Sequence, residues 1–224
     1  MKNKKIFIAC DTKSIKKVKK IIKETQTNKI KIGYKFGLEF FNSKNGRKFI
    51  SKLKNKVIFI DLKLHDIPNT MKSAVGALKD LDINYLTVHI GSGLKALKEV
   101  KKNSGKIKIV GVTTLTSLDN KNLKEIGYSK SVKKLVIHQS NLAHKANLDC
   151  LVVSPHEIKY VKKNFKKEII TPGIRFNSNI NDQKRVMTPK QAFKNGSDWL
   201  VVGRAVTKGS IKNNLKKLIN NISL

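Results

Sequence analysis

The sequence of 224 residues predicts an α/β fold, a closed (β/α)8 or TIM barrel in which residues 1–224 form a single domain. Eight short apolar segments alternate with eight amphipathic ones, an order typical of a parallel sheet covered by helices. The alternative is an open doubly wound sheet. It is disfavoured because no Gly-x-Gly-x-x-Gly follows the first strand, where the chain reads Asp11-Thr-Lys-Ser14.

The predicted strands are short runs of β-branched and aromatic residues, as expected for a parallel sheet that is buried on both faces. The first reads Lys5-Ile-Phe-Ile-Ala-Cys10, and the third contains Val57-Ile-Phe-Ile60. In chain order the eight predicted strands cover residues 5–10, 29–34, 57–63, 85–90, 108–115, 149–153, 168–171 and 199–202.

The predicted helices follow from apolar residues at helical spacing and from capping residues. Ser14 suits the N-cap of the first helix, and Pro68 suits the first turn of the helix after the third strand. Residues 119–131 are expected to form a polar excursion, that is, a connection without a helix or strand, and residues 176–187 a polar loop. The predicted helices cover residues 14–24 including the cap, 45–53, 69–81, 93–102, 132–146, a short helix from 155, 188 or 189 to 195, and 211–222.

Polar residues stand at the end of every predicted strand. Asp61 and Lys63 are two residues apart on one strand and therefore point the same way, and Asp66 follows just beyond. In a barrel these strand ends converge on one mouth, which favours a functional site over a surface ion pair that caps a single strand. The strand-end residues are Asp11, Lys35, Asp61 with Lys63, His89, Thr116, Ser154, Arg175 and Arg204.

The loops after the seventh and eighth strands predict an anion site. They carry Gly173, Arg175, Gly203 and Arg204. Glycine lets backbone N–H groups approach a phosphate, and arginine offers a bidentate fork that lysine lacks. The alternative for Arg175 is that it braces the rim of the barrel.

The net charge is extreme, because 48 Lys and Arg face 15 Asp and Glu, for a formal +33. A basic nucleic-acid-binding protein is therefore the alternative from another functional class. The lysines are dispersed along every helix, and aromatic residues that could stack on bases make up only 6%. Only four of the basic residues are arginines: Arg47, Arg175, Arg185 and Arg204. We interpret the charge as a compositional bias that attracts anionic substrates and binds polyanions weakly, with no specific nucleic acid as partner.

The cysteine content and the lack of long apolar runs predict a cytoplasmic protein with no membrane partner. Cys10 and Cys150 lie far apart in apolar segments, as expected for two reduced core thiols. The apolar segment near the start is too short for a signal peptide, and no run has the length needed to span a bilayer.

The decamer Asp61-Leu-Lys-Leu-His-Asp-Ile-Pro-Asn-Thr70 resembles the signature of the orotidine 5'-phosphate decarboxylase family. The resemblance covers about residues 6–207. The chain departs from the family pattern at Phe176 and Ala205, where the family often has proline. The further segments that resemble family motifs, in the expected order, are Asp11, Lys35-x-Gly37-x-Glu39, Val88-His89, Thr113-x-Leu-Thr-Ser117, Ser154-x-x-Glu157, Thr171-Pro-Gly-Ile-Arg175 and Val202-Gly-Arg204.

The resemblance implies a carboxy-lyase that converts orotidine 5'-phosphate to UMP and CO2 without a cofactor, the last step of de novo pyrimidine synthesis. Lys63 would stabilise the C6 carbanion and then protonate it. Asp61 would lie near the departing carboxylate, and Lys35 and Asp66 would complete an alternating Lys–Asp–Lys–Asp array.

The resemblance also implies how the substrate is held. Asp11 would hold the ribose hydroxyls, Thr116 or Ser117 the pyrimidine edge, and the loop 176–187 would close as a lid. The segment with Asp66 would reach the neighbouring subunit's site, which implies a homodimer with shared active sites. The implied substrate-binding residues are Asp11, Lys35, Ile67, Thr70, Thr116, Ser117, Pro172, Arg175, Gln183, Gly203 and Arg204.

The nearest alternative is a sister enzyme that acts on a sugar phosphate and usually needs Mg²⁺. The segment Ile67-Pro-Asn-Thr70 argues against it. No metal site is expected, because a lysine is interleaved between Asp61 and Asp66. His65 and His89 are expected to be structural hydrogen-bonding groups, because Lys63 already supplies the proton.

Overall fold

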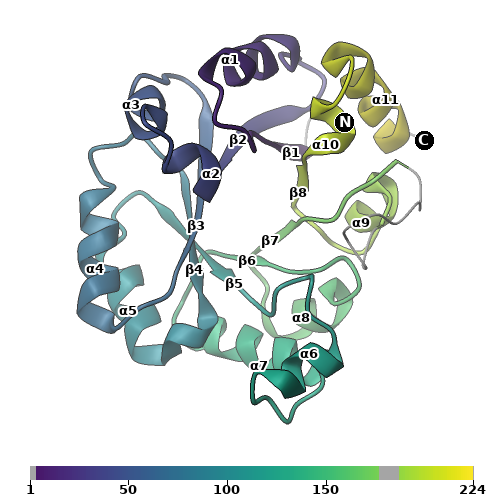
Figure 1. Ribbon diagram of the computed structural model, residues 1–224. Helices are drawn as coiled ribbons and strands as arrows, with labels where there is room; N and C mark the ends of the chain where they lie inside the picture. Colours follow the sequence, from purple (N-terminus) through teal and green to yellow (C-terminus); the bar gives the residue numbers. More distant parts are fainter. Residues whose placement is uncertain (1–3, 177–186, 224) are drawn as a thin grey trace.

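The computed structural model describes residues 4–176 and 187–223, and it confirms the barrel. Eight parallel strands pair in sequence order, and β1 closes the ring against β8. Figure 1 shows the strands at the centre of the molecule and the helices in a ring around them. The strands are β1 (Lys5–Ala9), β2 (Lys31–Gly37), β3 (Val57–Leu64), β4 (Tyr85–His89), β5 (Lys108–Val112), β6 (Cys150–Val152), β7 (Glu168–Thr171) and β8 (Trp199–Val202).

Three of the predicted helices begin where the capping residues indicate. Ser14 accepts the N–H of Lys17 at the start of α1, Thr188 forms a capping box at α9, and Pro68 is the first residue of α4. The helices are α1 (Ile15–Glu24), α2 (Leu38–Phe41), α3 (Gly46–Ser51), α4 (Pro68–Ala77), α5 (Gly93–Asn103), α6 (Asn120–Glu125), α7 (Val132–Lys145), α8 (Ile158–Asn164), α9 (Pro189–Lys194), α10 (Arg204–Thr207) and α11 (Ile211–Ser223), with a 3-10 turn η1 (Ile90–Ser92).

Three short helices, α2, α6 and α10, are absent from the sequence prediction. The expectation of a purely polar excursion over residues 119–131 is wrong, because α6 forms there. Asp119 and Asn122 cap that helix reciprocally, but Leu123 is its one buried residue, so no apolar periodicity marks it. Strand β2 also runs three residues further than predicted, to Gly37 rather than residue 34.

The barrel interior is filled by side chains from both the odd-numbered and the even-numbered strands. Phe7, Phe59, Val110 and Ile170 come from odd-numbered strands, and Tyr85, Cys150 and Trp199 from even-numbered ones, and all seven belong to one buried cluster. The rings of Phe7 and Trp199 stack with their centroids 4.0 Å apart. Gly33 on β2 leaves room for Phe7, because a Cβ there would lie 2.6 Å from the ring. This packed middle separates the two ends of the barrel.

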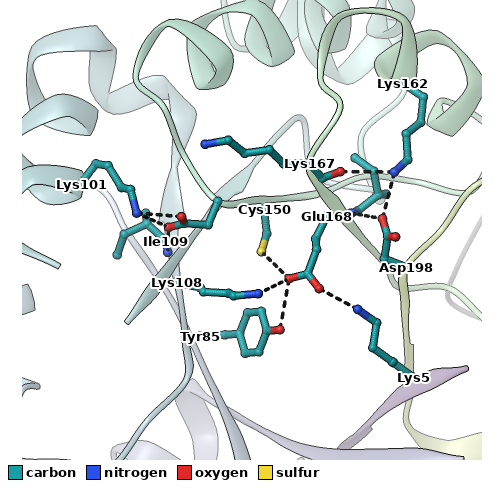
Figure 2. Close-up of polar contacts among 12 residues, drawn as sticks. Lys5, Tyr85, Lys101, Lys108, Ile109, Cys150, Lys162, Lys167, Glu168 and Asp198 are labelled. Carbon is teal, nitrogen blue, oxygen red and sulfur yellow. Dashed lines mark hydrogen bonds and ion pairs between the residues drawn. The ribbon is translucent and has the colours of Figure 1, made fainter. Parts of the chain in front are cut away.

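Glu168, at the start of β7, contacts side chains of other strands at the amino-terminal end of the barrel, which we call the floor (Figure 2). Its carboxylate accepts from Lys5 Nζ at 2.6 Å, from Lys108 Nζ at 2.8 Å and from Tyr85 Oη at 3.2 Å. Burial opposes ionisation, but the two lysines outweigh it and hold the pKa of Glu168 at about 2. The thiol of Cys150 contacts the same carboxylate, and both cysteines are buried and form no disulfide, as predicted.

Aspartates before two even-numbered strands fix the register at the same end. Asp149 Oδ2 accepts the N–H of Ile109 at 2.8 Å, and Asp198 Oδ2 accepts the N–H of Ile169 at 2.8 Å. Lysines on the surrounding helices neutralise both carboxylates, and Figure 2 shows Lys162 beside Asp198. The carboxylates of Asp149, Glu168 and Asp198 therefore have a structural role, because their hydrogen bonds connect strands of the barrel. Within the described ranges, no helix is long and apolar enough to cross a membrane.

Candidate active site

A cavity of about 260 Å³ opens at the carboxyl ends of the strands. It contains four cationic side chains, Lys35, Lys63, Arg175 and Arg204, and two carboxylates, Asp11 and Asp61, so its formal charge is 4 − 2 = +2. Such a site favours anionic ligands. The predicted site residues that line it are Asp11, Lys35, Asp61, Lys63, Thr116, Pro172, Arg175, Gly203 and Arg204.

Lysine and aspartate side chains alternate along one side of the cavity. Lys35 Nζ lies 3.3 Å from Asp11 Oδ1 and 3.3 Å from Asp61 Oδ2. The other oxygen of Asp61, Oδ1, lies 2.9 Å from Lys63 Nζ. Residues from the ends of β1, β2 and β3 thus form one continuous row of contacts, Asp11–Lys35–Asp61–Lys63.

Burial and charge pull the pKa values of this row in opposite directions. Burial alone would lower the pKa of Lys35, but Asp61 and Asp11 outweigh it and raise the pKa above its ordinary value. Burial alone would raise the pKa of Asp61, but Lys35 and Lys63 outweigh it and lower the pKa. Each buried group is therefore held in its charged form by its neighbours.

Lys63 reaches the cavity from an irregular part of β3. The sequence predicts that Asp61 and Lys63 share a face of a regular strand, and the two side chains do meet. The backbone there is not regular, because the register between β3 and β4 shifts between Ile60 and Leu64, and Lys63 has a φ of 51°. A positive φ in a lysine is uncommon and strained, and such strain concentrates at functional sites.

The arginines line the same cavity from the segments that follow β7 and β8. Gly173 has a φ of 76°, a conformation that favours glycine, and its carbonyl accepts the N–H of Met187 at 3.2 Å. Arg175 donates its backbone N–H to the carbonyl of Met187 at 3.2 Å. Arg204 is the first residue of α10 and directly follows Gly203. Two guanidinium groups and glycine-containing backbone thus border the same cavity, as the sequence predicts.

Several predicted residues lie elsewhere. Asp66, Ile67 and Thr70 do not line this chain's own cavity and are exposed, with Ile67 67% exposed. Asp66 accepts the backbone N–H of Ile67 at 2.7 Å. Ser117 is also exposed and outside the lining. Gln183 and residues 177–186 of the expected lid lie outside the described residues.

His65 and His89 form a stacked pair beside the site and do not line the cavity. Their ring centroids are 4.8 Å apart, and His89 Nδ1 accepts the N–H of Gly91 at 3.1 Å. Burial lowers the pKa of His89, and electrostatic interaction with His65 and Lys63 lowers it further. The pair therefore joins the end of β4 to the segment that follows Lys63.

The apolar and threonine walls of the cavity are not marked by the sequence. Thr114 is fixed by Gln139, whose Oε1 accepts both its N–H at 2.8 Å and its hydroxyl at 3.1 Å. Two-residue alternation along the strands marks such inward positions, but it does not separate cavity walls from core. The missed lining residues are Ala9, Phe59, Val112, Thr114, Leu115, Val152, Ile174 and Val201, whereas Gly173 of the predicted anion site does line the cavity.

Comparison with known proteins identifies close relatives. The sequence profile of the orotidine 5'-phosphate decarboxylase / HUMPS family matches residues 4–216. An orotidine 5'-phosphate decarboxylase of Wolbachia pipientis subsp. Culex pipiens (strain wPip) is 45% identical over 182 residues, which cover 79% of this chain and 80% of the relative. Another, of Wolbachia sp. subsp. Brugia malayi (strain TRS), is 41% identical and covers 96% of each chain. The crystal structure of orotidine 5'-phosphate decarboxylase from Lactobacillus acidophilus superposes with a TM-score of 0.82 at 27% identity, covering 99% of this chain and 100% of that one.

Proposed function

The chain belongs to the orotidine 5'-phosphate decarboxylase / HUMPS family, and we propose that it is a carboxy-lyase that decarboxylates orotidine 5'-phosphate to UMP and CO2 in pyrimidine synthesis. The observation that carries the proposal is the row Asp11–Lys35–Asp61–Lys63 in a cavity that Arg175 and Arg204 also line. The row offers a fixed ammonium for a carbanion, and the arginines offer a site for a phosphate.

The reaction needs one strong electrostatic contact and one proton. The bond between C6 and the carboxylate carbon breaks, CO2 leaves, and the electron pair stays on C6 in the plane of the pyrimidine. The ammonium of Lys63 stabilises that charge and then transfers a proton from Nζ to C6, which forms the C–H bond of UMP. A preorganised charge of this kind is usually the largest single contribution to catalysis. The reaction then uses no cofactor.

Lys63, rather than Lys35, is suited to be the donor. Lys35 Nζ lies between two carboxylates, and its side chain is 11% exposed. The side chain of Lys63 is 37% exposed, and within residues 4–176 and 187–223 the one carboxylate in contact with its Nζ is that of Asp61. Lys63 therefore keeps N–H groups that can face a ligand, whereas Lys35 holds Asp61 in place. Asp61 would crowd the substrate carboxylate and raise the energy of the ground state.

The remaining groups fit the rest of the substrate. Arg204, the backbone N–H of Gly203 and Arg175 would bind the phosphate, Asp11 the ribose hydroxyls, and Thr116 the pyrimidine edge, next to Pro172. Ser117 and Gln183 would join them when the loop 176–187 closes. Energy from binding the remote phosphate would drive that closure and raise the rate.

We further propose a homodimer with shared active sites, in the cytoplasm. Asp66, Ile67 and Thr70 are exposed and lie outside this chain's own cavity, as expected for residues that enter a neighbour's site. Ile67 is 67% exposed, which is high for an isoleucine without a partner subunit. Two unpaired buried thiols fit a reducing compartment.

The deciding experiment follows the ultraviolet absorbance of orotidine 5'-phosphate in EDTA for the wild type, Lys63→Ala and the control Lys23→Ala. Lys23 is exposed near the end of α1 and does not line the cavity, and its replacement removes one positive charge as well. We expect turnover by the wild type and the control and a loss of several orders of magnitude in Lys63→Ala. Activity that appears only with Mg²⁺ and a sugar phosphate would instead support the sister enzyme.

Subunit mixing tests the shared site. Lys63→Ala and Asp66→Ala subunits would each be inactive alone. If Asp66 acts in the partner's site, a mixed dimer holds one intact site and one doubly mutated site, so random mixing restores about a quarter of wild-type activity. No recovery from a mixture that forms heterodimers would contradict the shared site.

A further inference from the structure

We infer that Thr87 on β4 is a positioning residue that holds Asp61 and Lys63 in their working geometry. The inference rests on the proposed function, because it concerns the two residues that we assign to the chemistry. Thr87 does not line the cavity, and its exposed fraction is 0%. It therefore acts through its neighbours and does not touch the substrate.

The pairing of β3 with β4 leaves an irregular gap at Thr87. Ile60 is paired with Leu86, and Leu64 is paired with Val88. Three residues of β3, 61–63, therefore face the single residue 87 of β4. The regular ladder is interrupted over this stretch, and the backbone N–H groups of β3 need other acceptors there.

The hydroxyl of Thr87 fills the gap with two hydrogen bonds. Its Oγ1 accepts the backbone N–H of Lys63 at 2.7 Å and donates to Asp61 Oδ1 at 3.1 Å. A hydroxyl has one proton, so accepting from Lys63 leaves that proton for the carboxylate. Asp61 Oδ1 also receives Lys63 Nζ at 2.9 Å. These hydrogen bonds form a closed ring, which runs from the backbone of Lys63 through Thr87 and Asp61 to the side chain of Lys63.

This ring of hydrogen bonds accounts for the left-handed backbone of Lys63. A φ of 51° costs a lysine conformational energy, and such a conformation persists only where the surroundings hold it. The bond from the Lys63 N–H to Thr87 is short and fully buried on the threonine side. It sets the direction of the Lys63 side chain, and the second bond sets the rotamer of Asp61. Small displacements of catalytic groups cost large factors in rate.

The test compares Thr87→Val, Thr87→Ser and the control Thr25→Val in the same absorbance assay. Valine keeps the branched shape and removes both hydrogen bonds, whereas serine keeps the hydroxyl. Thr25 is equally buried, and its Oγ1 donates to the carbonyl of Ile21 at 2.7 Å and contacts Tyr34 Oη at 3.1 Å, so Thr25→Val matches the burial and the loss of hydrogen bonds away from the site.

We expect Thr87→Val to lower kcat by roughly 10- to 100-fold with little change in KM, as for the loss of hydrogen bonds to charged groups. Thr87→Ser should keep most of the wild-type kcat. Thr25→Val should lower the melting temperature as much as Thr87→Val does, with kcat unchanged. A Thr87→Val enzyme with wild-type kcat, or equal losses in Thr87→Val and Thr87→Ser, would overturn the inference.

Hydrogen exchange at the backbone amide of Lys63 gives a readout that does not depend on turnover. The amide should be protected in the wild type and in Thr87→Ser and should exchange at least about tenfold faster in Thr87→Val. A wild type that fails to decarboxylate orotidine 5'-phosphate would refute the proposed function, but hydrogen exchange at the Lys63 amide would still test the role of Thr87. Equal protection in all three proteins would refute the role of Thr87.

Discussion

Replacement of Glu168 by glutamine should destabilise the barrel at neutral pH and have no effect in strong acid. Glu168 accepts from Lys5 and Lys108 at the floor, and its side chain is 23% exposed. Its pKa falls from 4.5 to about 2 on folding. At about 1.36 kcal/mol for each pKa unit, that fall corresponds to at most about 3.4 kcal/mol of the free energy of unfolding. Partial exposure screens the charges, so we expect about 2 kcal/mol.

The sign of the pH dependence follows from the direction of the pKa change. A carboxylate whose pKa is lower in the folded state stabilises the fold above its unfolded pKa, here 4.5, and loses that contribution as the pH falls through its folded pKa of about 2. The difference between the wild type and Glu168→Gln should therefore be full at neutral pH. It should shrink between these two pKa values and vanish below the lower one.

Urea unfolding of both proteins, repeated from neutral pH into acid, measures this difference. Asp80→Asn is the matched control, because it adds the same change in net charge. Asp80 pairs with Arg47 at 2.7 Å on the surface, where the two side chains are 63% and 41% exposed, so its loss should cost under about 1 kcal/mol. A Glu168→Gln protein as stable as Asp80→Asn at neutral pH would refute the reasoning, and so would a loss that persists unchanged in strong acid.

Three further predictions concern the core and the site. Gly33→Ala should lower the free energy of unfolding by about 1–3 kcal/mol in urea, because its Cβ would lie 2.6 Å from the Phe7 ring; wild-type stability would contradict this. Lys35→Ala should raise the pKa of Asp61 and move the acid limb of the kcat/KM profile to higher pH; an unmoved limb would argue against the pair. His89 should titrate below 6.5 in an NMR experiment because it is buried, and a higher midpoint would refute that cause.

The sequence predicts the strands and the location of the site for a common physical reason. Buried strands need apolar runs, and a parallel barrel brings the ends of those runs to one mouth, so the polar residues that follow them meet there. Two-residue alternation predicts that the side chains of Asp61 and Lys63 meet, and they do, although the backbone between them is irregular. The roles of these residues, and those of Asp66 and Gln183, rest on the resemblance and remain predictions.

The irregular parts could not be predicted, because their causes are distant in the chain. Lys63 takes its left-handed backbone next to Thr87, which lies 24 residues further on. Glu168 is held at the floor by Lys5, 163 residues earlier. The short helix α6 buries only Leu123, so nothing periodic marks it. For Lys63 and Glu168 the partner is known only once the barrel closes, and local patterns do not encode it.

The two ends of the barrel use the same residue types, but the two lysines at the mouth differ in their exposure. At the floor, Glu168 is saturated by Lys5, Lys108 and Tyr85, so its charge is fully used in closing the barrel. At the mouth, Lys35 is saturated in the same way, with two carboxylates and a side chain 11% exposed.

Lys63 differs, because it is held by Asp61 on one side and is 37% exposed on the other. A ligand that approaches Lys63 meets an ammonium already fixed in position, and no ion pair has to break before the two make contact. In the mechanism that we propose, the charge that stabilises the carbanion is therefore preorganised, because the buried residues Lys35 and Asp61 hold Lys63 in position.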